Sequence, residues 1–329
     1  MKKDPYSEYI DRSVISIQNK YDKLMRQTKL LFFDYLQKGK TLEEFKEANS
    51  KIWDKVNHEF MTARYKELEE MIDKDIAKQF ELTIKELDEN VYGKNEYFKL
   101  EPMSRFTEVE RKYKNYIDRY YKSTKTTLDK EYIDETEYLS KQVSKYNEKQ
   151  ATIPYHNQDG SVRCYQTLST YCSMLYNTNL TRVGWNRTMA NADFLGEDLL
   201  YLPSHTGACP LCIKAQGYVY SKSGLNPEYR KMEEAIDGTY GMVGHPNCKH
   251  EWLIYTGKEM LQENKYDSAE WEEYYKNDQK LKALQRERTK LKTDRELYKK
   301  IGNMEEVDKL NLKIRKFNSK IKEQKELLK

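Results

Sequence analysis

The chain opens with a stretch in which apolar residues recur every three or four positions, as they do along one face of a helix. The stripe consists of Ile10, Val14, Ile17, Tyr21, Leu24 and Leu31. Asp4 and Pro5 provide a helix start, because Asp is a good N-cap and Pro suits the first helical position. We therefore predict one helix from this start to about Gln37, ended by Gly39.

Two more long helices are predicted before residue 150. The first begins at Thr41 and Glu44, which form a capping box, and continues to about Asp88. The second spans about 107–149, and its apolar stripe contains Tyr113, Ile117 and Tyr120. Helices of this length pack as a coiled coil or as an elongated bundle.

The pattern changes after residue 150. Residues 151–160, ATIPYHNQDG, are predicted to be a loop and a domain boundary. Two shorter helices follow, at about Cys164–Asn177 and Leu180–Leu195, and Gly196 is placed to end the second one.

From Leu199 onward, short runs of apolar and β-branched or aromatic residues replace the helical spacing, with turn residues between them. They are Leu199–Leu202, Tyr218–Tyr220 and Trp252–Tyr255. A polar insert, 221–242, lies between the last two runs. We expect a small sheet.

Helical spacing returns in the last part of the chain. One stripe lies between Trp271 and Tyr298, and another begins at Val307 and continues to Leu328. The turn residues Gly302 and Asn303 separate them. Two such stripes predict a helical hairpin, or one strand each of a coiled coil.

Composition supports a mainly helical chain around a small packed centre. Of 329 residues, 38% are hydrophobic and 34% are charged, and the mean hydropathy is −1.00, which is too polar for one large core. Disorder is the alternative, but 28 Tyr and 9 Phe recur at helical spacing. No window is apolar enough to span a membrane, and the first residues do not form a secretory signal.

The predicted fold class is therefore mainly α, with a small α+β centre stapled by zinc and with an elongated helical bundle or coiled-coil arms. We expect three consecutive parts. They are an elongated helical region, 1–150; a small α+β domain with Cys/His knuckles, 151–256; and a basic helical hairpin or coiled coil, 257–329.

Positive charge gathers at the end of the chain. Residues 280–329 hold 17 Lys and Arg against 8 Asp and Glu, which leaves the rest of the chain mildly acidic. Such a tail suggests a polyanion or an acidic protein surface as partner, and the alternative is an ordinary solvated helix.

The candidate chemistry lies in the predicted sheet region. Cys209 and Cys212 form a C-x2-C knuckle, and His245 and Cys248 repeat that spacing as H-x2-C. Two residues between ligands let both side chains turn toward one ion, so two knuckles predict a closed, tetrahedral, structural Zn²⁺ site. His250 competes with His245 for the fourth position.

Other assignments of these residues remain open. His205 is a weaker candidate ligand, and the knuckles could also be reduced thiols that pack without metal. A catalytic metal would need a nearby carboxylate as base. Glu251 is the adjacent acid, and we expect it to be solvated. Cys164 and Cys172 are expected in the core.

Three motifs together resemble the phage minor capsid and head morphogenesis family, the group that includes the Mu F-type head proteins. They are DLLYLPSHTGACPLC with the following QGYVYS, the run GHPNCKH, and the helix YKNDQKLKALQRER. The resemblance covers about 165–325. Lys249 stands where the family usually has Arg, and the insert 221–242 is not shared. Some relatives lack the C-x2-C knuckle, so zinc is argued here from this sequence alone.

The resemblance implies a low-copy structural protein of the phage head, located in the virion after synthesis in the host cytoplasm. It implies portal and capsid proteins as partners, a role in capsid assembly or DNA packaging, and no enzymatic activity. The long stripes suit oligomeric helix contacts, and the basic tail 280–329 could face packaged DNA.

Two other functions are compatible with the knuckles. A metal-dependent nuclease of the treble-clef type would bring His205 and His250 together near an acid. A zinc-ribbon DNA-binding protein would carry its basic charge close to the knuckles, whereas here that charge lies in the tail.

Overall fold

The computed structural model divides into two compact units whose boundaries fall within four of the helices. The first unit comprises Met1–Ile17, His58–Met103 and Cys172–Glu272, and the second comprises Gln18–Asn57, Ser104–Tyr171 and Glu273–Lys329. The structure describes residues 5–54, 58–91, 97–130, 133–146, 153–156, 161–204, 208–239, 242–257 and 269–328.

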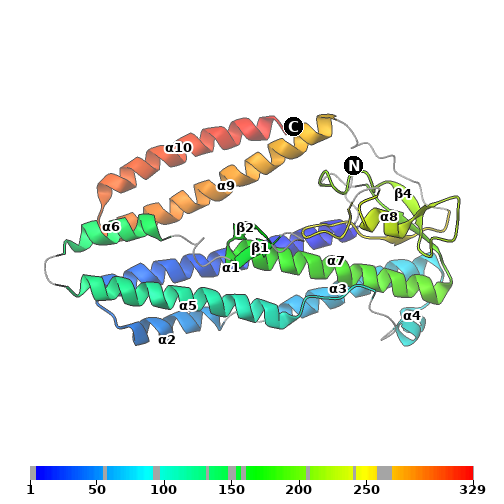
Figure 1. Ribbon diagram of the computed structural model, residues 1–329, viewed down its shortest axis with the longest axis horizontal. Coiled ribbons are helices and arrows are strands. Elements are labelled where there is room, and N and C mark those ends of the chain that lie inside the picture. The colour runs from blue at the N-terminus through cyan, green and yellow to red at the C-terminus, as the bar shows by residue number, and fades with distance from the viewer. Residues whose placement is uncertain are drawn as a thin grey trace. The chain divides into compact units, whose positions relative to one another are not determined.

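Helices dominate both units (Figure 1). The second unit is built from most of α1 (Pro5–Gln37), α2 (Leu42–Trp53), α5 (Met103–Leu128), α6 (Glu135–Lys145), most of α9 (Ala269–Ile301) and α10 (Met304–Glu326). The first unit contains the start of α1, α3 (Glu59–Gln79), α4 (Ile84–Val91), most of α7 (Leu168–Leu195), a four-stranded sheet and α8 (Met232–Ile236). The mainly helical fold class with a small sheet is confirmed.

Aromatic rings pack against one another in the core of the second unit. Phe45 stacks on Tyr121 with ring centroids 4.2 Å apart, and Phe32 stacks on Tyr120 at 5.2 Å. Tyr146 contacts Phe32 edge-on at 5.5 Å. Each ring buries a large area, and the offset and edge-on geometries add to that burial.

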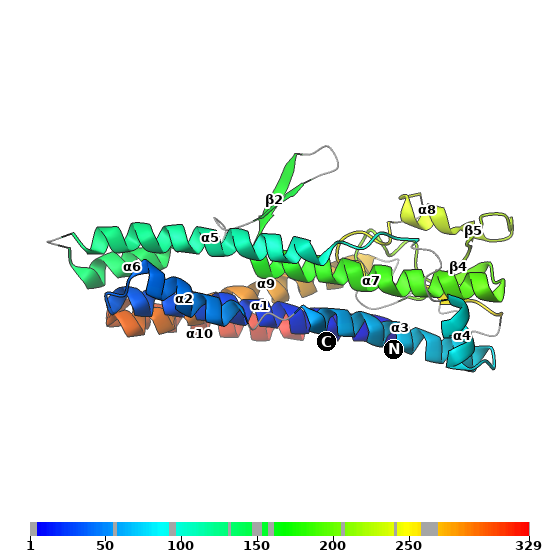
Figure 2. The ribbon, with the colours of Figure 1, turned by 90° about the horizontal axis from the view of Figure 1, so that it is seen from below.

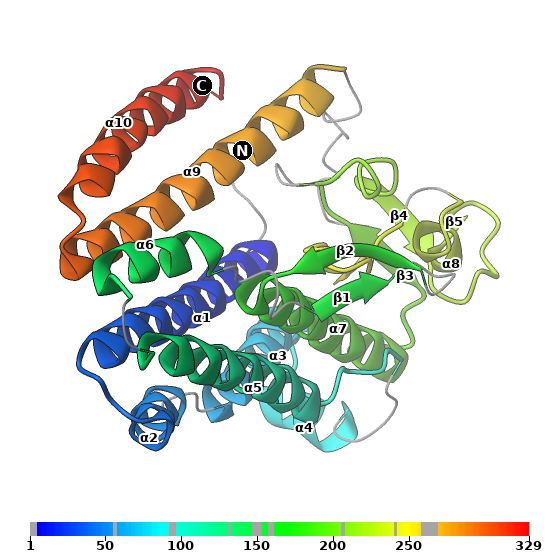
Figure 3. The same ribbon diagram turned by 60° about the vertical axis from the view of Figure 1, so that its left-hand side comes forward.

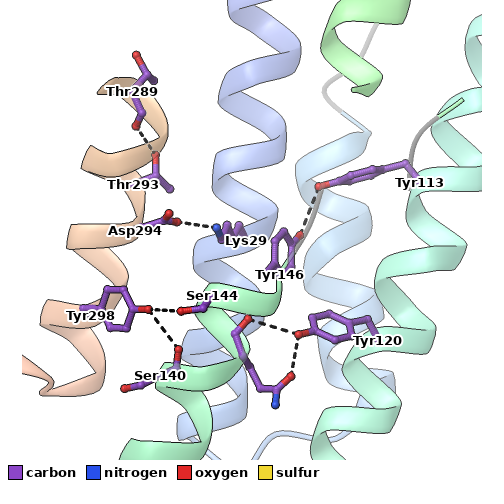
Figure 4. Close-up of polar contacts among 11 residues, drawn as sticks. Lys29, Tyr113, Tyr120, Ser140, Ser144, Tyr146, Thr289, Thr293, Asp294 and Tyr298 are labelled. Carbon is purple, nitrogen blue, oxygen red and sulfur yellow. Dashed lines mark hydrogen bonds and ion pairs between the residues drawn. The ribbon is translucent and has the colours of Figure 1, made fainter. Parts of the chain in front are cut away.

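Polar contacts tie α9 to α1 and α6 inside this unit (Figure 4). The Lys29 ammonium is 3% exposed and lies 2.7 Å from Asp294 Oδ1 and 4.9 Å from the centre of the Tyr146 ring. The Tyr298 hydroxyl lies 2.7 Å from the Ser144 hydroxyl. The hairpin of α9 and α10 is therefore anchored near its turn, beside α6 (Figure 3).

Several sequence predictions are confirmed in these helices. α1 spans the predicted range, and the Thr41–Glu44 capping box is present in both directions. Gly196 has a φ of 69° after α7, as a residue past a helix C-terminus often does. The helical hairpin at the end of the chain forms, with its turn at Gly302 and Asn303.

Three predicted helix boundaries are wrong. The helix expected to reach Asp88 is divided into α2, α3 and α4, and Glu81 has a φ of 58° where α3 ends. The helix expected over 107–149 is two helices, because Asp134 caps α6 by accepting from the Glu137 N–H. Conversely, the two helices expected between Cys164 and Leu195 form one continuous helix, α7, from Leu168.

The loop predicted at 151–160 contains a strand. β1 (Ile153–His156) pairs antiparallel with β2 (Val162–Gln166), and the register shifts between Tyr155 and His156. This hairpin rises from the helices of the second unit (Figure 2).

The sheet of the first unit confirms the three predicted extended runs. β3 (Leu199–Leu202) pairs antiparallel with both β4 (Tyr218–Ser221) and β6 (Leu253–Ile254). β5 (Arg230–Lys231), in the polar insert, joins β4 in parallel and was not predicted. No helix in the described part of the chain is long and apolar enough to cross a membrane.

A buried ion pair connects α3 to α7 in the first unit. Arg187 donates two hydrogen bonds to the Asp73 carboxylate, at 2.7 and 2.6 Å, and Asn191 donates a third at 3.0 Å. The Arg187 and Asp73 side chains are only 7% and 4% exposed. Removing one partner would leave the other charge buried and uncompensated.

We predict that Asp73→Ala lowers the free energy of unfolding by about 3–5 kcal/mol. Chemical denaturation followed by circular dichroism measures this. Glu70→Ala on the same helix is the control, because its pair with Lys74 is long and exposed and should contribute under about 1 kcal/mol. A double change, Asp73→Leu with Arg187→Met, should recover much of the loss. Equal losses for Asp73→Ala and Glu70→Ala would contradict the stabilising role of the buried ion pair.

Candidate metal centre

The first knuckle is a tight turn that follows β3. The Cys212 and Ile213 N–H groups both donate to the Cys209 carbonyl, at 3.0 and 3.1 Å. This turn brings the two sulfur atoms to 3.6 Å. Two thiolates on one tetrahedral zinc ion lie about 3.8 Å apart, given Zn–S bonds of about 2.3 Å. The knuckle therefore has the spacing that a shared ion requires.

The second knuckle is also a turn, and its sequence explains its shape. The Cys248 N–H donates to the His245 carbonyl at 2.9 Å. Pro246 favours the first central position of such a turn, and Asn247 takes the second with a φ of 70°. Asn tolerates this left-handed conformation better than most residues, so the run His-Pro-Asn-Cys suits the turn.

The five predicted ligands form two overlapping groups. Cys209, Cys212 and His245 make up one group, and Cys212, Cys248 and His250 make up the other. Within each group the ligand atoms all lie within 4.8 Å of one another. His245 Nε2 lies 3.0 Å from Cys209 Sγ and 3.1 Å from Cys212 Sγ.

Cys212 joins the groups, with its sulfur 3.8 Å from that of Cys248. His250 Nδ1 is 3.7 Å from Cys248 Sγ. The structure thus brings together all the residues predicted to bind metal, while His205 lies outside the described residues.

Each imidazole is oriented through its far nitrogen. His245 Nδ1–H donates to the Pro246 carbonyl at 2.7 Å, which leaves Nε2 facing the thiols. His250 Nε2–H donates to Gln216 Oε1 at 3.0 Å, which turns Nδ1 toward Cys248. Metal-ligating histidines characteristically donate their other ring N–H to such an acceptor.

The electrostatics of the cluster favour thiolates at Cys209 and Cys248, whereas hydrogen bonds with these two cysteines raise the pKa of Cys212 well above its usual value. Hydrogen bonding by Cys212 and then His245 lowers the pKa of Cys209 to about 4. Burial opposes ionisation of Cys248, but hydrogen bonds from Cys212 and His250 hold its pKa well below the usual value. Burial likewise opposes protonation of His245, yet the Cys209 thiolate raises the His245 pKa to about 9. A divalent cation would replace the protons that these groups share.

Side chains of α7 donate hydrogen bonds to backbone carbonyls in and next to the second knuckle. The Asn177 amide and the Thr181 hydroxyl both donate to the Cys248 carbonyl, at 2.7 and 2.9 Å. One turn further along, Trp185 Nε1–H donates to the His250 carbonyl at 2.7 Å. Spacings of four residues put these three side chains on one face of the helix.

A different set of α7 side chains binds the extended segment before α5. The Asn179 amide accepts from the Glu101 N–H at 2.8 Å and donates to the Glu101 carbonyl at 2.9 Å. Asn186 makes the same pair of bonds with Phe98, at 2.7 and 2.9 Å. The sequence analysis did not identify either group of α7 side chains. The signal was Asn and Thr residues that recur along the sequence of α7 at spacings of four and seven.

One comparison with known proteins identifies the family of this chain. The family model of phage minor capsid protein 2 matches residues 159–324, just over half of the chain. The chain belongs to that family. The match spans both knuckles, α7 and nearly all of α10, so the predicted resemblance to phage minor capsid proteins is confirmed. No curated protein and no solved structure gives a significant match.

Membership of this minor capsid family supports a structural role in the capsid and a location in the phage head. Lys249 stands at the position where Arg was expected from the resemblance, and it forms an ion pair with Asp11 at the start of α1. The neighbouring Lys249 carbonyl accepts from the Ser7 hydroxyl at 2.8 Å. The residue between Cys248 and His250 thus ties the knuckle to α1 within the first unit.

The position of Glu251 in this minor capsid protein shows that one sequence prediction is wrong. It was expected to be solvated, but the structure buries it completely. Its carboxylate packs against Gly184 of α7, where a β-carbon would collide with it. Cys172 is buried as predicted, and the side chain of Cys164 lies outside the described residues.

Gly244, just before the second knuckle, offers a sharp test of the packing. It has a φ of 79°, and a β-carbon there would lie 2.8 Å from the Trp185 ring. We predict that Gly244→Ala costs clearly more than the about 1 kcal/mol that backbone strain alone imposes, because Trp185 must move away from His250. Thermal and chemical unfolding measure the loss.

Gly257→Ala is the matched control. Gly257 has nearly the same φ, 81°, but a β-carbon there meets nothing within 4 Å among the described residues. It should therefore show the strain cost alone. Equal losses at Gly244 and Gly257 would mean that Trp185 does not confine the knuckle.

Proposed function

We propose that this chain is a structural, non-enzymatic component of the phage head that associates with the portal and acts in capsid assembly or DNA packaging. Family membership supports the capsid role. The portal association, the head interior and the oligomeric helix contacts come from the resemblance and the long apolar stripes, and they are proposals. The basic tail 280–329 is the part that we assign to packaged DNA.

We further propose that one structural Zn²⁺ ion holds the first unit together. The observation that carries this is the convergence of three cysteines and two oriented histidines from segments far apart in the chain. Three sulfur ligands and one imidazole nitrogen match the closed tetrahedral sites that zinc occupies in structural knuckles. When bound, the ion would cross-link the two turns and neutralise the thiolates.

His245 is the favoured fourth ligand beside Cys209, Cys212 and Cys248. Its Nε2 lies within 3.1 Å of two sulfurs, whereas His250 Nδ1 lies 3.7 Å from one. His250 would then support Cys248 from outside the tetrahedron. The sequence left open which of the two histidines takes the fourth position, and substitution of each one tests this choice.

A zinc ion would also explain how so small a sheet folds. Its strands are two to four residues long, and such a sheet buries little apolar surface by itself. Small cores of this kind commonly need a metal or a disulfide. Cys209, Cys212 and Cys248 form no disulfide, which leaves their sulfur atoms available to an ion.

The metal content of the protein tests the zinc site directly. Elemental analysis of the purified full chain should give about one zinc per molecule. A strong chelator, or Cys209→Ser with Cys212→Ser, should remove the zinc and abolish hydrogen-exchange protection over residues 198–255, while the helices of the second unit stay protected. Cys172→Ala changes a buried cysteine outside the knuckles and should retain the metal. A zinc-free chain with full protection at 198–255 would disprove the site.

The choice of histidine is tested separately. His245→Ala should weaken zinc binding by at least about 100-fold, and His250→Ala by about 10-fold, the lower end of what an outer-sphere partner contributes. Competition with a chromophoric chelator measures both affinities. The reverse ranking would make His250 the ligand and His245 the supporting residue.

The head assignment is tested in the virion. Gel electrophoresis of purified heads should show the chain at low copy number, and cross-linking should join it to the portal. Its absence from purified heads would overturn the proposed function, whatever the metal analysis shows.

A further inference from the structure

The hairpin of α9 and α10 concentrates its positive charge in the middle rather than spreading it along both helices. Residues 312–322 of α10 contain five basic residues and no acidic one. Residues 280–292 of α9 contain six basic residues and one acidic one. We call these two segments together the basic band. The acidic residues of α10 lie outside it, toward the two helix ends.

The antiparallel pairing brings the two halves of the basic band side by side. Arg288 donates to the Asn318 side-chain oxygen at 3.4 Å, and the two residues lie within the two segments. Gln324 donates to the Asn277 carbonyl at 3.2 Å, just beyond one end of the band. Figures 1 and 3 show the two helices running alongside each other.

Lysines of the band are exposed and share a face. Lys313, Lys316 and Lys320 are all solvent-exposed, and their spacing of three and four residues aligns them along α10. The buried stripe of the same helix, which includes Ile314 and Ile321, lies elsewhere on its circumference. Charge on this face is therefore not needed for packing of the hairpin.

The α10 half of the band differs from the charged surface elsewhere in the second unit, whereas Lys282 in the α9 half pairs with Asp278 at 2.6 Å. On other helices an exposed Lys sits four residues from a Glu that it pairs with, such as Lys51 with Glu47 and Lys141 with Glu137. Within residues 312–322 no acidic residue is available for such a pair. Among the described residues, no ion pair involves Lys313, Lys316 or Lys320.

We propose that the basic band is a sequence-independent binding surface for the phosphate backbone of double-stranded DNA. This inference rests on the proposed head function, which puts the chain beside packaged DNA, and it narrows the contact from the whole tail to one face. Uncompensated lysines complement a regular row of phosphates, and the segment 312–322 is about 15 Å long, which is about four base pairs of duplex. No base-reading element is involved, so the affinity depends on charge and salt.

The test uses fluorescence anisotropy of a 30-base-pair duplex with the full-length protein. The band variant combines K290Q, K313Q, K316Q and K320Q. At about 100 mM salt it should bind at least about tenfold more weakly, and the slope of log Kd against log salt should fall by about two to four, because each phosphate contact contributes about 0.9. Two duplexes of unrelated sequence should bind equally.

The matched control combines K23Q, K46Q, K122Q and K130Q. It removes the same charge from four exposed lysines of the second unit outside the band. Circular dichroism should show both variants folded. If control and band variants weaken binding equally, general charge rather than the band is responsible. If poly-glutamate competes as well as duplex at equal charge, the surface serves an acidic protein. Either result overturns the proposal.

Incorporation of the band variant into heads separates this inference from the proposed function. If the wild-type chain and the band variant both enter heads and the variant binds duplex as tightly as the wild type, the basic band is refuted and the head function stands. A chain that is absent from heads refutes the head function even if duplex binding follows the prediction.

Discussion

The first unit depends on the hydrogen bonds that side chains of α7 make to buried backbone groups of other segments. The Cys248 carbonyl is buried and accepts from two α7 side chains, Asn177 and Thr181. Two further α7 side chains, Asn179 and Asn186, each bond both the backbone N–H and the carbonyl of one residue, Glu101 and Phe98 respectively. A buried backbone group left without such a partner costs about 1–3 kcal/mol. The helix therefore replaces the sheet ladder that these irregular segments lack.

The proposed metal and α7 act on the same few residues from opposite sides. Side chains of the second knuckle turn toward the thiol cluster, while its carbonyls turn toward the helix. Closing the long segment between Cys212 and His245 costs conformational entropy. An ion bound at both ends of that segment would offset this cost. The helix fixes the orientation of that loop end through Trp185, whose ring leaves space only for glycine at position 244. The helix contacts are present in the structure, and the ion is the second constraint that we propose for so short a sheet.

The parts that were predicted from sequence are those encoded locally. The knuckles follow from spacing, the capping box from Thr41 and Glu44, and the strands from apolar runs. Continuity of α7 was missed because its polar middle resembles a turn in isolation. The partners that stabilise it as helix, Phe98, Glu101 and Cys248, lie about 70 to 90 residues away. Glu251 was misplaced for the same reason, since its burial depends on the small residue at Gly184. The three consecutive domains remain a prediction.

The second unit separates its packing from its charge. Its core is aromatic, and the α9–α10 hairpin is anchored near the turn through Lys29, Asp294 and Tyr298. The exposed lysines of the basic band on α10, Lys313, Lys316 and Lys320, occupy positions that the buried stripe does not use. Substitutions there change the electrostatic surface without opening a cavity or leaving a buried group unpaired. Such an arrangement lets charge on the hairpin vary independently of stability, whereas a change at Lys29 or Asp294 alters both.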